Sequence, residues 1–555
     1  MPVPNLTDQK GLEKHKQLLA SMDEERRDWF PHWREISDYY LPRRYPWLRT
    51  AKESKTANMR NRKLLSSTST MAVRTLASGM MNGITSPARN WFSLRIPGFD
   101  QESMSQEAAE YLEEVERRIM LVLSESNFYN SIAMLYLEWC TFGTASMSIE
   151  EDFDDVVRCY NYPLGEFYLS TDSTGRINRH GRRFVRTVEQ MVEQFGEENC
   201  SEQVVADFKL GGTKLFLQKE IGHIVEAVPA DAVDQYPSRW RSVYWEVGKA
   251  SGKYLQMTPV YEWPMVSPRW ELLGDDSYGT SPAMDALADT IELQNLLLER
   301  AKGLAKQISP PLIVDQQLRN RPKALGANGI TYAATYNSNF GAKEAYKVNT
   351  PLDAIAFDVA ELKRSIQATC YNPLFNMISQ LDTVRSATEI DARREEKLVH
   401  LASVLERFYN EGLDPALKRV FGIMQRSGLL PDPPEELEEA AIEVNYISVL
   451  TDAQRASGTI TIERFLQFIG NISGVYPEAT RVPDVEELIR SYATGIGIKP
   501  KGLKSKEAVA AAAEAEDAQA ELAQSAAVGN DLAAGAKVLS DTDVGGGMNA
   551  LQSML

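Results

Sequence analysis

The stretch YGTSPAMDALADTIELQNLLLERAKGLAKQISPPLIV, residues 278–314, decides the architecture of this 555-residue chain. Ser281 and Pro282 favour a helix start, because serine caps the first free amide groups and proline fits the first helical position. Apolar side chains then recur at helical spacing as far as Ile308. Ser309 precedes two prolines, which cannot continue a helix. We therefore predict a helix over residues 282–308.

Residues 309–352 form an insert between this helix and a second one. The insert contains the runs PPLIVD and GANGITYAA, which are typical of strands and turns. Residues 353–370 again have helical periodicity, and Pro373 must kink or interrupt that helix. Two helices thus bracket a compact insert.

A third helical region begins at Ser386, in the sequence Ser-Ala-Thr-Glu, which is a capping box. Asp414 and Pro415 restart the helix, and Gly428 with the prolines of LLPDPP ends it. Residues 505–526 favour a helix but have little large apolar surface, so packing against other copies would help them. We expect the tail, residues 527–555, to be flexible.

Toward the N-terminus, helical periodicity marks residues 8–40, 64–81, 106–124 and 128–140. Between residues 143 and 264 the pattern changes to short runs of β-branched and aromatic residues, broken by glycine and proline. This change predicts a mixed α/β or β-rich lobe. The whole chain is therefore expected to be mixed and predominantly α.

The composition is 43% hydrophobic and 25% charged, which with this length allows roughly three or four domains. The longest uncharged stretches are shorter than the roughly 18 residues needed to cross a bilayer, so we expect no membrane span. The start, MPVPNLTDQKGLEKHKQ, lacks the apolar core of a signal peptide, and we expect folding in a cytoplasm. The four cysteines form no CxxC pair and are expected to be buried free thiols.

The formal net charge of −17 is unevenly distributed. Residues 1–100 hold 17 basic and 10 acidic side chains, whereas residues 431–555 hold 9 and 20. This asymmetry permits head-to-tail contact between identical subunits, although ordinary solvated faces explain it equally. The acidic total argues against a protein that grips nucleic acid by neutralising phosphates. Residues 43–63 differ: their eight Lys or Arg residues, one Glu and two aromatic residues could contact phosphates or a neighbour's acidic face.

No motif for catalysis stands out. The segment GKASGKY, residues 248–254, is one residue short of a phosphate-binding loop and ends in tyrosine. The five histidines form no HxxH or HExxH pattern, and acidic pairs such as Asp154 and Asp155 fall on predicted loops. We therefore expect no enzyme, no metal site and no cofactor.

Four blocks of sequence resemble the portal proteins, or head-to-tail connectors, of short-tailed bacteriophages. The most specific elements, ASG, GxTSP and WF, lie in the first block. The blocks follow the order of the family and cover residues 64–94, 111–147, 278–314 and 383–434.

The resemblance implies a phage portal fold with an α/β wing, a helical stem, a small α/β clip and a helical crown. The implied regions are a wing at 1–280, stem helices at 281–308 and 353–378, a clip at 309–352, a channel loop at 379–385, a long wing or tunnel helix at 386–434, a crown-like region at 435–526 and the tail at 527–555.

Such proteins form a ring, typically of twelve subunits, at one capsid vertex of the virion, and DNA passes through it during packaging and ejection. The implied partners are further copies of the chain, double-stranded DNA, the terminase motor, a tail adaptor, the major capsid protein and a scaffolding protein. No membrane is implied. Assembly would take place in the host cytoplasm. The candidate channel residues are Lys302, Lys306, Gln380, Asp382 and Arg385. The three basic ones could equally pair with an acid on a neighbouring subunit.

Two alternatives to a portal ring remain open on the residues. One is another oligomeric virion protein, such as a tail or internal ejection component. The other is a nucleic-acid-processing enzyme.

Overall fold

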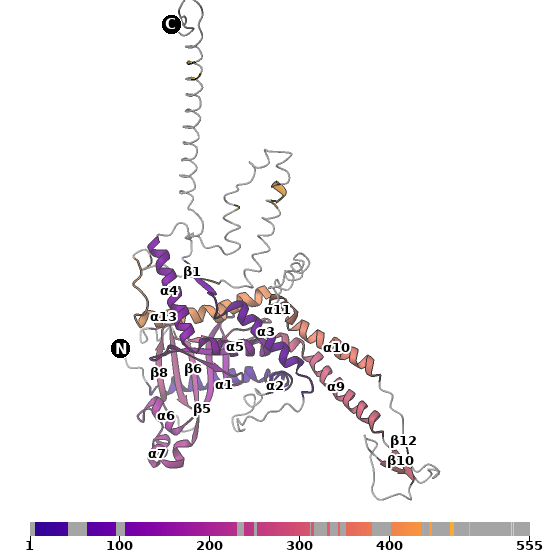
Figure 1. The fold of residues 1–555 in the computed structure, drawn as a ribbon. Helices are drawn as coiled ribbons and strands as arrows, with labels where there is room; N and C mark the ends of the chain where they lie inside the picture. The colour runs from indigo at the N-terminus through magenta and orange to yellow at the C-terminus, as the bar shows by residue number, and fades with distance from the viewer. Residues whose placement is uncertain are drawn as a thin grey trace, which may run out of the picture. The chain divides into compact units, whose positions relative to one another are not determined.

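The computed structural model describes residues 6–42, 64–95, 106–229, 238–248, 252–310, 312–315, 330–333, 342–344, 351–379, 401–434, 437, 443–446, 465, 467–470, 488, 534 and 537. This part of the chain is predominantly helical with a few sheets (Figure 1), which confirms the predicted mixed, predominantly α class. The chain divides into two compact units, residues 1–96 with 110–454 and residues 97–109 with 455–555. Apart from the first residues of α4 (Gln106–Glu125), the features below lie in the first unit.

The other α-helices are α1 (Gln9–Arg27), α2 (Phe30–Tyr39), α3 (Thr68–Ile84), α5 (Phe128–Phe142), α6 (Val188–Phe195), α7 (Glu202–Leu210), α8 (Pro282–Asp285), α9 (Leu287–Ile308), α10 (Leu352–Thr369), α11 (Asn372–Ser379) and α13 (Asp414–Arg426). A 3-10 helix, η3 (Gly212–Phe216), and a π-helix, η7 (Tyr409–Leu413), are also present.

The strands are β1 (Phe92–Arg95), β2 (Ser146–Asp152), β3 (Val156–Tyr162), β4 (Phe167–Thr171), β5 (Ile177–Thr187), β6 (Gln218–Ala227), β7 (Trp240–Glu246), β8 (Tyr254–Val260), β9 (Met265–Val266), β10 (Leu312–Asp315), β11 (Ile330–Ala333), β12 (Ala342–Glu344) and β13 (Glu443–Tyr446). They form sheets in the orders β4-β5-β6-β7-β8, β3-β2-β9, β11-β10-β12 and β1-β13.

The helical pattern over residues 8–40 is divided into α1 and α2. Asp8 caps α1, where its side chain accepts a hydrogen bond from the backbone N–H of Gly11 at 3.1 Å. A proline lies in the first turn of α2, where its missing N–H would be unpaired in any case. In the interior of one continuous helix the same proline would remove a hydrogen bond, so two helices form instead of one.

The five-stranded sheet separates two packed layers. On one face, Leu19 and Met22 of α1 join a cluster with Ile224, Val243 and Trp245. Because alternate residues of a strand point to opposite faces, His180 of β5 points to the other face. There its Nε2 lies 2.9 Å from the hydroxyl of Ser146 on β2. The lobe predicted between residues 143 and 264 is thus mixed α/β, with the sheet between α1 and the β3-β2-β9 sheet.

The helices α8 and α9 correspond to the helix predicted over residues 282–308, with a break at Ala286 that no residue type signals. In the insert, β10 pairs in parallel with β11 and antiparallel with β12. The helix α10 ends before Cys370, and Pro373 lies at the second position of α11, as the predicted interruption requires. A Cβ atom added at Gly79 of α3 would lie 2.3 Å from the ring of Phe375, so this glycine lets α11 approach α3 closely.

A π-helical turn precedes α13. Residues 401–408 are helical and continue through η7 into α13, so the helix predicted to restart at Asp414 is continuous with the one before it. Pro415 lacks an N–H and would clash with a carbonyl in a regular α-helix, and the wider π turn accommodates it. The turn also carries Glu411, whose Oε1 lies 2.6 Å from Nη2 of Arg269, a side chain that is 1% exposed.

Several predictions concern residues that lie outside the described part of the chain. These are the basic segment at 43–63, the capping box at Ser386, the expected channel loop beyond Ser379 and almost all of residues 435–555.

Candidate channel and subunit-contact surface

The helix α9 is attached to the N-terminal helices on its buried side. The hydroxyl groups of Tyr40 and Thr290 lie 2.9 Å apart. One turn further on, the buried side chain of Gln294 accepts hydrogen bonds from the backbone N–H groups of Leu65 and Ser66, at 2.7 and 3.0 Å. It also donates to the carbonyl of Ser66 at 3.1 Å. The residues that flank the basic segment 43–63 are therefore both attached to α9.

The helices α9 and α10 lie side by side and lead to the small β11-β10-β12 sheet (Figure 1). The pairing is fixed by a hydrogen bond of 2.6 Å from the hydroxyl of Ser365 on α10 to the carboxylate of Asp289 on α9. Leu293 of α9 and Val359 of α10 belong to one buried cluster. Since the antiparallel strands β10 and β12 follow α9 and precede α10, the two helices run in opposite directions.

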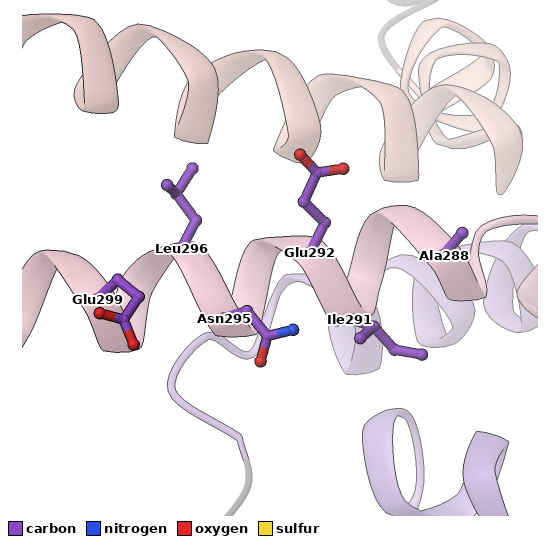
Figure 2. A pocket seen from close by; sticks show the side chains of 6 residues that line it. All are labelled: Ala288, Ile291, Glu292, Asn295, Leu296 and Glu299. Atoms are coloured by element: carbon purple, nitrogen blue, oxygen red, sulfur yellow. The ribbon is translucent and has the colours of Figure 1, made fainter.

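One face of α9 carries a shallow groove with a volume of about 550 Å³. Figure 2 shows the six lining residues, with Glu292 and Leu296 along the edge of the groove nearer the neighbouring helix and Asn295 along the other edge. The residues that line it are Ala288, Ile291, Glu292, Asn295, Leu296 and Glu299. This groove was not predicted from the sequence. Its signal was the spacing of three and four residues between positions 288, 292, 295 and 299, which places these side chains on one face.

Lys302 and Lys306 continue the same spacing and therefore the same face of α9. Lys302 is exposed, and its Nζ lies 2.8 Å from Oε1 of Glu299. The hydrogen bond from Lys302 lowers the pKa of Glu299, and the charges of Lys302 and Lys306 add to this effect. The groove and the two lysines thus form one exposed face of mixed charge. Gln380, Asp382 and Arg385 lie outside the described residues, so the structure places only Lys302 and Lys306 of the five candidates.

Large apolar side chains are exposed along both helices beyond the groove. Leu298 and Ile308 of α9 are 42% and 73% exposed, and Phe357 of α10 is 69% exposed. Exposed apolar surface on a helix pair is typical of a face that another chain covers.

Two buried histidines each lie beside a serine hydroxyl group. His180 and Ser146 lie within hydrogen-bond distance, as do His223 and Ser242 at 2.9 Å. Both histidines are buried, and burial lowers the pKa of His180 to about 3, with the charge of Arg182 adding to the effect. A neutral histidine that no substrate can reach is a packing element. Over the residues that the structure describes, no group of three or more His, Cys, Asp or Glu could hold a metal ion. Within the same residues, no helix is long and apolar enough to span a membrane.

Comparison with known proteins gives a match over most of the chain. Residues 12–503 match the family model described as "Bacteriophage head to tail connecting protein". The chain belongs to this family. It is 35% identical over 530 residues to the "Portal protein" of Salmonella phage epsilon15, a match that covers 94% of each chain. It is also 35% identical over 529 residues to the "Probable portal protein" of Bordetella phage BPP-1, covering 94% of this chain and 93% of the relative.

These matches decide between the alternatives. A tail or internal ejection component is not favoured, because the family and both relatives are connector or portal proteins. The connector family is a structural one, and its members are virion components at the junction of head and tail. The predicted resemblance to portal proteins is therefore confirmed.

Proposed function

We propose that this head-to-tail connector assembles into a closed ring, of twelve subunits by the family resemblance, around a channel through which double-stranded DNA enters and leaves the capsid. The observation that carries the proposal is the antiparallel pair α9 and α10, which bears a small sheet at one end and joins a mixed α/β body at the other (Figure 1). The matched family covers this whole arrangement, from residue 12 to residue 503.

The pair is assigned to the regions of a portal. We assign α8 and α9 to the first stem helix, α10 and α11 to the second, and the β11-β10-β12 sheet to the clip. The lobe with the five-stranded sheet becomes part of the wing, residues 379–385 the channel loop, 386–434 the long wing or tunnel helix, and 435–526 the crown. The exposed apolar side chains on α9 and α10 support this assignment, since neighbouring stems in a ring would cover them.

The charge distribution suits a conduit that DNA slides through. The net charge of −17 limits the binding of phosphates, and tight binding would stall the movement of a duplex. Lys302 lies on an exposed face but pairs with Glu299, and this pairing weakens its electrostatic attraction for a phosphate. Lys302 and Lys306 would then contribute a weak and salt-dependent attraction.

The remaining roles follow from the ring. Its partners would be the terminase motor, a tail adaptor, the major capsid protein and a scaffolding protein, and assembly would take place in the host cytoplasm. The chain itself would catalyse no reaction, since the motor that hydrolyses ATP is a separate protein.

Electron microscopy of the purified full-length chain tests the ring directly. We expect closed rings with an axial hole wide enough for a DNA duplex, and monomers or open filaments at every protein concentration would refute the proposal. An ATPase and nuclease assay of the same preparation, with added divalent metal, tests the absence of catalysis. Turnover that copurifies with the chain and exceeds a mock purification would contradict it.

A further inference from the structure

The β2–β3 hairpin ends in a fully exposed aromatic side chain. Phe153 is 110% exposed, which is more than any other large apolar residue in the described part of the chain. The short loop that carries it is held in shape, because Asp152 accepts hydrogen bonds from the backbone N–H groups of Asp154 and Asp155 at 2.9 and 3.0 Å. Five of the six residues at positions 150–155 are acidic. Glu151 is paired with Arg426 at 2.8 Å and Asp155 lies 3.7 Å from Arg158, so part of this charge is balanced within the subunit. The hairpin thus presents one phenyl ring within a tip that remains acidic.

A small pocket with the opposite charge lies between α1 and the five-stranded sheet. It has a volume of about 170 Å³ and is lined by Lys16, Leu19, Arg183, Trp245, Val247 and Gly248. Its lining is apolar apart from two basic side chains. The Nζ atom of Lys16 lies 2.8 Å from Oε1 of Glu13 on the same helix, so part of this positive charge is already balanced and Arg183 supplies the rest. Gly222 lets Trp245, one of the lining residues, pack directly on the sheet, because a Cβ atom at that position would lie 2.4 Å from the indole ring.

The hairpin and the pocket belong to opposite faces of the five-stranded sheet. The pocket lies on the face covered by α1, where Leu19 packs near Gly181 and Trp245. The hairpin strand β2 lies on the other face, where Ser146 contacts His180. Two complementary features on opposite faces cannot meet within one subunit. They can meet between two copies, and each copy then still offers its own hairpin and its own pocket.

We propose that the Phe153 hairpin of one subunit docks into the α1–sheet pocket of the next subunit in the ring. The phenyl ring would lie against Leu19 and Trp245, and the acidic residues of the hairpin would face Lys16 and Arg183. Such a contact is head-to-tail, so it repeats around a ring and closes when the rotation per subunit allows closure. A phenylalanine buries about 150–250 Å² when it is covered, which makes it an effective anchor at the centre of a contact. This inference rests on the proposed ring and names the contact within it.

Cross-linking between cysteines tests the docking. The four native cysteines are all buried, so introduced thiols will react selectively. The full-length chain would carry Phe153→Cys together with Val247→Cys and would be treated with a short bis-maleimide after assembly. We expect a ladder of covalent multimers in denaturing gels. A matched control combines Phe153→Cys with Lys209→Cys, which places the second thiol on the exposed side of α7.

The outcomes separate this contact from the ring itself. Closed rings without a ladder above the control would overturn the docking and leave the portal function in place, whereas an absence of rings in the unmodified chain would refute the proposed function. An independent test uses charge. Phe153→Ala and Lys16→Glu should each raise the protein concentration needed for assembly by about tenfold or more, and Asp154→Lys should partly restore assembly of the Lys16→Glu chain. Unchanged assembly in both single variants would also overturn the docking.

Discussion

Replacing Glu411 by alanine should strongly destabilise the subunit. Arg269 is 1% exposed, and Glu411 accepts three hydrogen bonds from it: one from its backbone N–H at 3.0 Å, one from Nε at 3.1 Å and one from Nη2 at 2.6 Å. The alanine variant leaves a buried guanidinium without its counter-charge. Removing one partner of a buried ion pair costs about 3–5 kcal/mol. In the variant, Arg269 would still donate a hydrogen bond from Nη2 to the carbonyl of Gly175, at 2.8 Å.

The assay is urea unfolding of the chain at protein concentrations below those of assembly, followed by circular dichroism. Glu411→Gln keeps the shape and one acceptor oxygen, so it should cost less than Glu411→Ala. The double variant with Arg269→Met should be more stable than the sum of the two single changes predicts, because the uncompensated charge is gone. Glu114→Ala, which removes a partly exposed ion-pair partner on α4, is the control and should change stability little. A change below about 1 kcal/mol for Glu411→Ala would refute the reasoning.

Three further predictions concern other packed features. Gly79→Ala should destabilise the subunit by about 1–3 kcal/mol in the same assay, because the new Cβ atom overlaps the ring of Phe375. Ser78→Ala, on the exposed side of α3, is the control and should not destabilise it. Equal effects of the two variants would contradict the close approach of α11 to α3. Gln294→Ala should cost about 2–4 kcal/mol, because it removes three hydrogen bonds to residues 65 and 66, and an unchanged unfolding midpoint would contradict that attachment. His180 stays neutral in the folded chain down to a pKa of about 3, so it should contribute a fall in stability of about 1.4 kcal/mol per pH unit as the pH drops below about 6.5, where the unfolded histidine gains a proton. His180→Asn should reduce this slope, and an unaltered pH profile would show that the buried ring does not carry it.

Local signals in the sequence predicted most element limits. Ser281 and Pro282 start a helix, and Pro373 interrupts one, because the chemistry of a cap or a missing N–H acts within a few residues. The break at Ala286 has no such signal. The π turn was not predicted either, since Pro415 indicates only that a regular helix cannot pass and does not say how the chain accommodates it.

The parts of the candidate surfaces that depend on distant residues could not be predicted. Arg269 and Glu411 are 142 residues apart in sequence, and only the tertiary fold brings them together. Asp154 and Asp155 were predicted to lie on a loop, but a local pattern of this kind says nothing of Phe153 as an exposed anchor or of a pocket on the opposite face of a sheet. Lys302 was proposed for the channel from resemblance, and its pairing with Glu299 depends on side-chain geometry that helical spacing permits but does not require.

The attachment of Tyr40 and of Leu65 to neighbouring turns of α9 has a practical consequence for labelling. The two anchor residues, Thr290 and Gln294, are four positions apart, which corresponds to about 6 Å along a helix. The segment between Tyr40 and Leu65 therefore has its two ends attached close together. Each doubling of loop length adds only about 0.6 kcal/mol of closure entropy, so a peptide tag or small fluorescent module inserted between residues 43 and 63 should be tolerated by the fold. Such an insertion would give each subunit one reporter.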